Sequence, residues 1–111
     1  MPVKLTYAIK FVKDMGNAVR FYRDTLGLKL KFESPDWTEF DTGDTILALH
    51  IASNVNQAGS VELGLGVADI DAFCAGLKSR GVKITREPET IHGAKLAEFL
   101  DCEGAKCSLG E

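Results

Sequence analysis

The sequence lacks long apolar segments, a basic excess and a cysteine framework, and each absence excludes a class of protein. Its apolar runs last only a few residues, too few to cross a bilayer. Lys and Arg number 13 against 16 Asp and Glu, giving a net charge of -3, so no strongly positive surface is available for a phosphate backbone. The three cysteines fit neither a disulfide framework nor a paired zinc motif. We therefore expect no membrane span and no nucleic-acid partner.

Three smaller absences narrow the function further. The first residues, MPVKLTYAIKF, lack the apolar core and cleavage site of a secretory signal, which favours a cytoplasmic location. The Gly-x-Gly of ELGLGV falls within an expected strand and opens no helix, so it is not a phosphate-binding loop. Cys74 is expected on a buried helix face, and Cys102 and Cys107 flank an expected turn, so all three are predicted to be free thiols.

What is present is a repeat. The stretch VKDMGNAVRFYRDTLGLKL, which begins at Val12, is echoed by VADIDAFCAGLKSRGVKI, which begins at Val67, an offset of 55 residues. Apolar residues recur in both copies at the i, i+3, i+4, i+7 spacing of an amphipathic helix. These stripes are Met15, Ala18, Val19 and Tyr22 in the first copy and Ile70, Phe73, Cys74 and Leu77 in the second. Two such copies in the same order make chance an unsatisfactory explanation.

The surroundings of the two helices extend the repeat. Asp14 and Asp69 suit helix N-caps, and Gly27 and Gly81 suit left-handed positions after the helices. Each helix is preceded by one alternating segment and followed by three. With hydrophobic residues at 45%, the 111 residues suffice for one α+β domain. We expect two βαβββ modules, about 1–52 and 61–111, joined by the polar linker 53–60, with curved mixed sheets around a cavity.

The motifs FVKDMGNAVRFYRDTLGL, WTEFDTG, LALH and FLDCEGAKCSLGE resemble the vicinal oxygen chelate superfamily, which includes glyoxalase I, extradiol dioxygenases and bleomycin resistance proteins. The resemblance covers nearly the whole chain and implies the paired βαβββ fold. It does not imply a single activity, because the same fold hosts several chemistries and some binding proteins.

The resemblance also implies four positions for the ligands of a divalent metal ion. Carried over one at a time, they fall on Tyr7, Ala48, Glu62 and Ser108. Only Glu62 is an ordinary metal ligand, since alanine cannot bind and a serine hydroxyl binds divalent ions weakly. We therefore expect no cofactor and no metal site of the glyoxalase type.

His50 leaves an alternative open. It lies two residues after Ala48, so both side chains should point to the same face of a strand. His50 and Glu62 could then form a displaced metal site or an acid–base pair. The competing interpretation is a structural histidine at a strand end, hydrogen-bonded to the backbone.

Trp37 completes the expected site, because it begins a strand near the expected cavity rim and could stack on a planar ligand. Packing between sheets is the alternative, and Phe11, Phe21 and Tyr22 are assigned to the core. Acidic residues cluster nearby at Asp36, Glu39, Asp41 and Asp44, as a solvated hairpin or as a rim that attracts cations. The sequence thus predicts a binding protein, a homodimer, for a small, partly apolar or aromatic molecule. Its expected ligand-binding residues are Tyr7, Trp37, Ala48, His50, Glu62 and Ser108, and the alternative is a metal-dependent lyase or isomerase.

Overall fold

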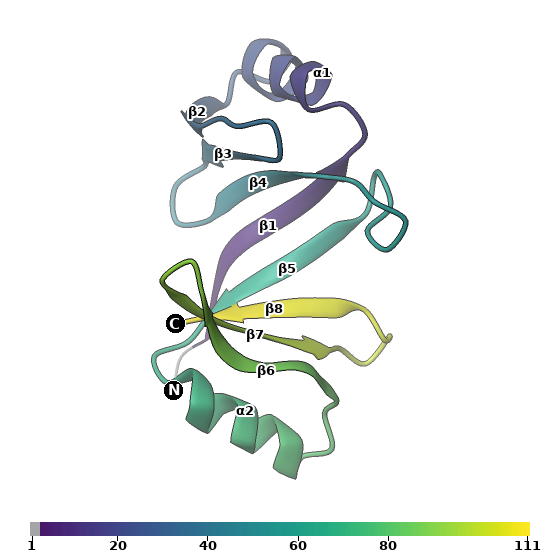
Figure 1. Cartoon of the computed structure of the whole chain (residues 1–111). Helices are drawn as coiled ribbons and strands as arrows, with labels where there is room; N and C mark the ends of the chain where they lie inside the picture. The colour runs from purple at the N-terminus through teal and green to yellow at the C-terminus, as the bar shows by residue number, and fades with distance from the viewer. Residues whose placement is uncertain (1–2) are drawn as a thin grey trace. The chain divides into compact units, whose positions relative to one another are not determined.

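The computed structural model describes residues 3–111 and contains eight strands and three helical segments (Figure 1). In chain order these are β1 (Lys4–Val12), α1 (Met15–Arg20), the π-helical turn η1 (Phe21–Thr25), β2 (Lys29–Phe32), β3 (Trp37–Asp41), β4 (Ile46–Ile51), β5 (Val61–Gly66), α2 (Ile70–Ser79), β6 (Ile84–Ile91), β7 (Ala94–Leu100) and β8 (Lys106–Gly110). The order βαβββ therefore occurs twice, as the repeat predicted.

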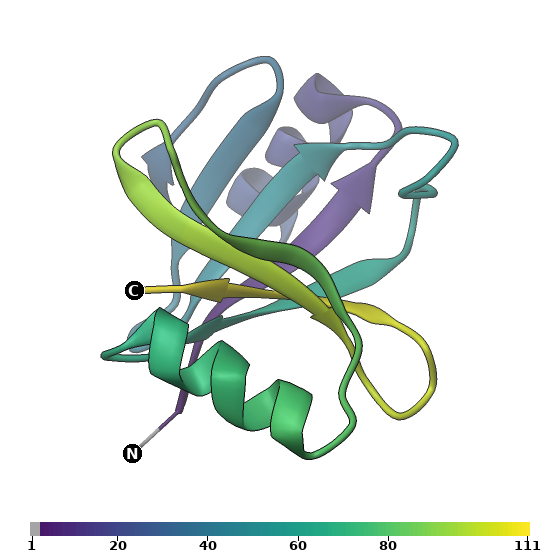
Figure 2. The same cartoon turned by 60° about the horizontal axis from the view of Figure 1, so that its bottom comes forward.

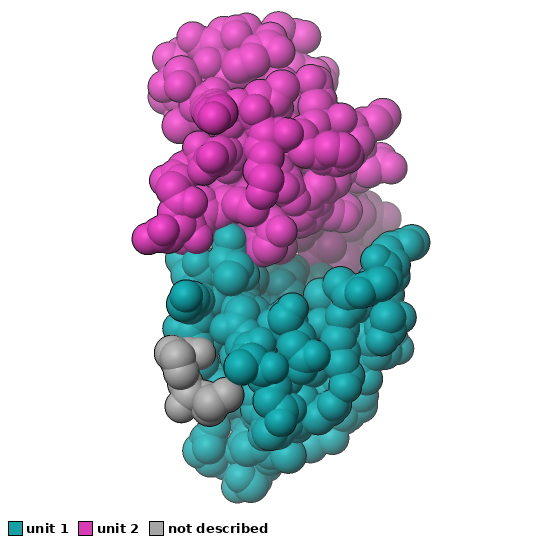
Figure 3. Space-filling model, turned by 90° about the vertical axis from the view of Figure 1, so that its left-hand side faces the viewer, with its two compact units in different colours: residues 1–6, 62–111 teal, residues 7–61 magenta. Residues whose placement is uncertain are grey.

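The chain forms two compact units, and Figure 3 colours them separately. Unit 2 comprises Tyr7–Val61, and unit 1 comprises Met1–Thr6 with Glu62–Glu111. Strand β1 thus begins in unit 1 and continues in unit 2.

Each unit carries a mixed sheet with the same topology. In unit 2 the strand order is β2-β3-β4-β1, in which β1 and β4 are parallel and the other neighbours antiparallel. In unit 1 the order is β5-β8-β7-β6, in which β5 and β8 are parallel and the other neighbours antiparallel. The expected α+β fold with two βαβββ modules is confirmed.

The predicted helix ends are confirmed as well. The Asp14 side chain accepts a hydrogen bond from the Asn17 amide at 3.0 Å, and the Asp69 side chain accepts one from the Ala72 amide at 3.1 Å. These bonds satisfy amides that the first helical turn leaves without partners. Gly27 and Gly81 follow the helices with φ of 77° and 84°, a region that favours glycine.

Each helix covers one face of the sheet in its own unit (Figure 2). In unit 2 the predicted helix stripe packs with side chains from β3 and β4, among them Phe40 and Leu49, which are fully buried. In unit 1 the second stripe packs with Ala97 and Leu109 from β7 and β8. The alternation of side chains along a strand sends the intervening residues to the opposite face.

The prediction that Phe21 belongs to the core was wrong. Its side chain is 48% exposed, although the stripe residues on either side of it in the helix are buried or half-buried. Phe21 lies outside the i, i+3, i+4, i+7 stripe, and it begins the π-helical turn rather than continuing the α-helix. Its hydrophobic character alone therefore did not determine its burial.

A close approach in unit 1 provides a test of this packing. A Cβ atom built on Gly66 would lie 2.8 Å from the Thr6 Cγ2 methyl. The Thr6 hydroxyl donates a hydrogen bond to the Gly64 carbonyl at 3.1 Å. Rotation of the Thr6 side chain would therefore relieve the contact only by breaking this hydrogen bond.

We predict that Gly66→Ala lowers the free energy of unfolding by about 1–3 kcal/mol, the usual effect of overpacking. Thr6→Ser removes the methyl group and keeps the hydroxyl, so the double variant should regain most of the loss. Chemical denaturation of the four proteins measures this. If Gly66→Ala lowers the free energy of unfolding equally in the unchanged protein and in Thr6→Ser, the contact with the Thr6 methyl is not the cause.

Candidate functional site

Four ring side chains lie together on the face of the unit 2 sheet opposite α1. Phe11, Trp37 and His50 occupy adjacent positions on β1, β3 and β4, since Phe11 and Trp37 both face His50 in the strand register. The ring centroids of Trp37 and His50 are 5.8 Å apart, and those of Phe11 and His50 are 5.4 Å apart. Tyr7 extends the row, with its ring centroid 6.0 Å from that of Trp37. These four residues are called the aromatic face below.

Two buried aliphatic residues lie beside these rings on the same face of the sheet. Ile9 and Ala48 face each other across β1 and β4, and both are buried in one cluster with Phe11. Tyr7 and Trp37 pack on this cluster but remain half-buried. The Tyr7 and Trp37 rings therefore pack against buried neighbours while part of their own surface stays accessible.

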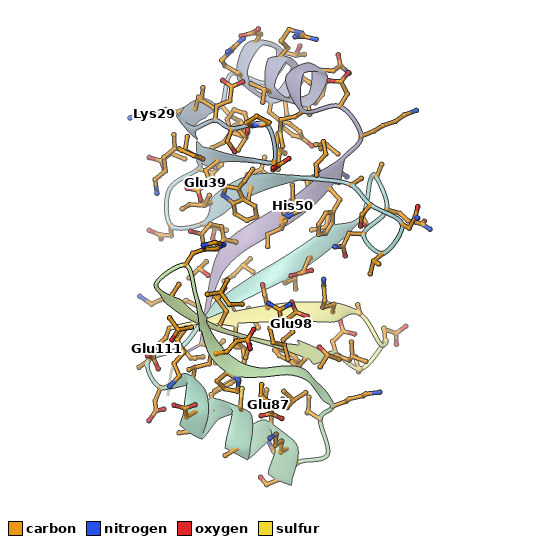
Figure 4. The ribbon with its side chains drawn as sticks, viewed as in Figure 1. Lys29, Glu39, His50, Glu87, Glu98 and Glu111 are labelled. Carbon is orange, nitrogen blue, oxygen red and sulfur yellow. The ribbon has the colours of Figure 1, made fainter. Side chains whose placement is uncertain are left out.

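Glu39 adds a carboxylate to this face. It is the next residue but one after Trp37 on β3, so both side chains point the same way. The indole Nε1–H of Trp37 donates a hydrogen bond to Glu39 Oε2 at 2.8 Å, and Lys31 Nζ lies 3.9 Å from Glu39 Oε1. Only 16% of the Glu39 side chain is exposed, so the carboxylate is largely shielded from water. Figure 4 shows Glu39 and His50 on the strands of this unit.

The four residues of the acidic cluster expected on the hairpin therefore fall into two groups. Asp36, Asp41 and Asp44 are exposed, and the Asp41 side chain accepts a hydrogen bond from the Gly43 amide within the turn. These residues fit the solvated hairpin. Glu39 alone joins the aromatic face.

The hydrogen bond of His50 identifies its tautomer. Its Nδ1 lies 2.8 Å from the Ile51 carbonyl oxygen, which can only accept a hydrogen bond. Nδ1 must therefore carry the proton, and in the neutral ring Nε2 keeps a lone pair that can accept a hydrogen bond. The backbone contact expected of a structural histidine is present, and it leaves the second nitrogen available to a ligand.

The other two expected site residues share a sheet face in unit 1. Ser108 lies between Gly64 on β5 and Glu98 on β7 in the strand register, and Glu62 points to the same side as Gly64. The Lys106 Nζ atom lies 3.3 Å from Glu62 Oε1, and the Glu62 side chain is only 10% exposed. The one ordinary ligand among the four implied metal positions thus already has a cationic partner.

Glu98 was not singled out from the sequence. It occupies the same place in unit 1 as Glu39 in unit 2, since Glu98 faces Ser108 and Glu39 faces Ala48. Its carboxylate lies 3.8 Å from Arg86. The repeated dipeptide Glu39-Phe40 and Glu98-Phe99 is the signal that could have identified both carboxylates.

Within residues 3–111, no three His, Cys, Asp or Glu side chains form a group that could hold a metal ion. The side chains at Tyr7, Ala48 and Ser108 explain this, since none offers the carboxylate or imidazole that a divalent ion prefers. The residues present do not fit a metal centre of the implied type.

The cysteines are free, as predicted, and two of the three are buried. Cys74 is buried in α2 and Cys107 in β8, and burial raises the pKa of both thiols. A raised pKa lowers the fraction of reactive thiolate at neutral pH. Cys102 is exposed in the turn between β7 and β8.

Two grooves beside the helices are alternatives to the sheet faces. A groove of about 610 Å³ in unit 2 is lined by residues that include Val12, Asp14 and Ala18, and one of about 330 Å³ in unit 1 is lined by residues that include Val67 and Asp69. Val12 and Asp14 correspond to Val67 and Asp69 in the repeat. The grooves therefore follow from the way each helix leaves its strand, and neither is lined by an expected site residue.

No helix in the described part of the chain has the length and apolar character required to cross a membrane.

Burial gives Tyr7 a pKa above its usual value of about 10, and the charge of Glu39 raises that pKa further. Tyr7 therefore carries its hydroxyl proton at neutral pH and can donate a hydrogen bond. Because the unfolded chain releases this proton at lower pH than the folded chain, stability should fall as the pH rises above 10.

We predict that absorbance at 295 nm shows a late tyrosinate transition, which begins above pH 10, in the folded protein. Tyr7→Phe should remove this late transition. A late transition that persists in Tyr7→Phe would contradict the assignment.

Comparison with known proteins agrees with the fold. The sequence model of the Glyoxalase/Bleomycin resistance protein/Dioxygenase superfamily matches residues 4–107 of this chain. A lactoylglutathione lyase from Haemophilus influenzae is 22% identical over 134 residues, covering 97% of this chain and 99% of that protein.

Two solved structures share the fold. A hypothetical protein from Bacillus halodurans has a TM-score of 0.83 at 19% identity, covering 100% of this chain and 95% of its own. The methylmalonyl-CoA epimerase from Mycobacterium tuberculosis has a TM-score of 0.77 at 21% identity, covering 96% of this chain and 86% of its own. Because the family model spans almost the whole chain, this protein belongs to the Glyoxalase/Bleomycin resistance protein/Dioxygenase superfamily.

Proposed function

We propose that the protein binds a small, partly apolar or aromatic molecule on the aromatic face of unit 2. The observation that carries the proposal is the row of four rings, buried at Phe11, half-buried at the other three positions and packed beside Ile9 and Ala48. Aromatic side chains held in this way offer apolar area at little cost in conformational entropy.

Polar groups at the edges of the rings would orient the ligand. The Tyr7 hydroxyl can donate a hydrogen bond, while Glu39 and the Nε2 atom of His50 can accept one. An apolar surface with a few convergent polar groups is the usual composition of a small-molecule site. Membership of a superfamily that includes bleomycin resistance proteins is consistent with a binding role.

Trp37 provides the measurement, because it is the only tryptophan in the chain. We expect at least one compound in a panel of neutral aromatic and cationic molecules to change the Trp37 fluorescence in a saturable way. His50→Ala should then weaken binding of that compound about 5- to 30-fold, the effect of losing one well-packed contact of 1–2 kcal/mol.

Phe21→Leu is the matched control, because it alters an exposed aromatic ring on the helix rather than on the aromatic face. Its affinity should equal that of the unchanged protein. Absence of any saturable response across the panel, with the fold intact by circular dichroism, would refute the proposal.

A second candidate is a metal-dependent lyase or isomerase that uses His50 and Glu62. The observation in its favour is the similarity to a protein named lactoylglutathione lyase. Against it stand the ion pair between Glu62 and Lys106 and the missing ligands at the other implied positions. Cytoplasmic location and pairing into a homodimer stay predictions from the sequence.

Metal analysis separates the two candidates. After purification without chelators, we expect less than one nickel, zinc, manganese or iron ion per chain, and no change in that content in His50→Ala. Stoichiometric metal that is lost in His50→Ala would favour the enzyme instead.

A further inference from the structure

The charges around the aromatic face indicate which class of ligand it prefers. We infer, on the basis of the proposed binding function, that the aromatic face selects an organic cation of the alkylammonium class. Four features of unit 2 carry this inference: the tilted rings, the shielded carboxylate, the tautomer of His50 and the position of Lys31.

The rings supply the first attraction. The Trp37 ring is inclined by 58° to Tyr7 and by 86° to His50, so the three do not stack flat on one another. Rings inclined in this way present both faces and edges to a molecule that lies among them. The negatively polarised face of tryptophan or tyrosine attracts a cation most strongly when water is partly excluded.

Glu39 supplies the second attraction for a cation. Its carboxylate accepts the indole N–H, the positive edge of the Trp37 ring, and so brings a full negative charge to this aromatic surface. Because the Glu39 side chain is only 16% exposed, its field is screened by water less than that of the exposed hairpin aspartates. The Nε2 lone pair of His50 adds a second acceptor, which suits a ligand that carries N–H groups or a positive centre.

Lys31 provides the internal competitor. Its ammonium lies 3.9 Å from Glu39, and its side chain is 52% exposed. Because the ammonium is largely in water and lies 3.9 Å from the carboxylate, the pair is weak, and a desolvated ligand cation can replace the lysine there. Removal of the lysine charge should therefore strengthen cation binding, whereas removal of the carboxylate charge should weaken it.

Choline and 3,3-dimethylbutan-1-ol test the inference, because they have nearly the same shape and differ in charge. The single tryptophan gives one indole N–H signal in a ¹⁵N–¹H correlation spectrum, and that signal reports directly on the Glu39 bond. We expect choline to shift this signal saturably and to bind about tenfold more tightly than the neutral alcohol.

Three variants separate a local effect from net charge. Glu39→Gln should lower choline affinity about tenfold and leave affinity for the alcohol unchanged. Lys31→Met should raise choline affinity. Lys29→Met is the matched control, because Lys29 lies on the same edge strand, opposite the exposed Asp41, and its loss changes the net charge equally (Figure 4).

The outcomes distinguish the inference from the function on which it depends. Equal affinity for choline and the alcohol, or equal gains in Lys31→Met and Lys29→Met, would overturn the cation preference while ligand binding itself stands. If neither probe shifts the indole signal and the broader panel also fails, both the preference and the proposed function are wrong.

Discussion

The alternation of side chains along β3 and β4 is the constraint on which the functional face depends. Thr38 and Phe40 are fully buried, and Phe40 packs with the helix stripe, so Trp37 and Glu39 must point to the opposite face of the sheet. On β4, Leu49 points to the helix and His50 to the other side. A one-residue slip of either strand would exchange the two sets, which would expose the core and bury the carboxylate. The packing of the helix thus fixes the register that gathers the aromatic face.

The hydrogen bond between Trp37 and Glu39 then orients the indole ring and the carboxylate on this face. Without it, the indole would offer only apolar area, and its N–H would need another partner when half-buried. With it, the ring has a fixed orientation and the carboxylate is held close to the sheet. Binding surfaces gain affinity when groups are held in place before the ligand arrives, because less conformational entropy is then lost.

Much of the fold could be predicted from the sequence because its rules are local. The N-caps at Asp14 and Asp69 and the left-handed glycines follow from short-range chemistry, and the helix stripes follow from a spacing that repeats. Glu39 was harder to identify, because its role depends on a partner on the same strand face and on how far neighbouring side chains shield it from water. An exposed aspartate and a shielded glutamate in one acidic stretch look alike until the register is known. Phe21 was assigned to the core on its hydrophobicity alone, although it lies outside the helix stripe that the sequence itself displays.

The two repeats show how one sheet pattern can acquire two surface chemistries. The positions of Ile9 and Phe11 in unit 2 are taken by Gly64 and Gly66 in unit 1, and His50 corresponds to Gly110. Glutamate persists at the Glu39 and Glu98 position in both. In unit 2 the carboxylate accepts an indole N–H, whereas in unit 1 it lies beside Arg86, on a face where Lys106 also pairs with Glu62. Both carboxylates also have a cationic side chain close by, Lys31 at 3.9 Å from Glu39 and Arg86 at 3.8 Å from Glu98, so the difference between the units lies in the neutral groups around them. The duplication therefore left the same acidic position in each unit, and the aromatic rings that lie beside Glu39 in unit 2 are replaced by glycine at Gly66 and Gly110 in unit 1.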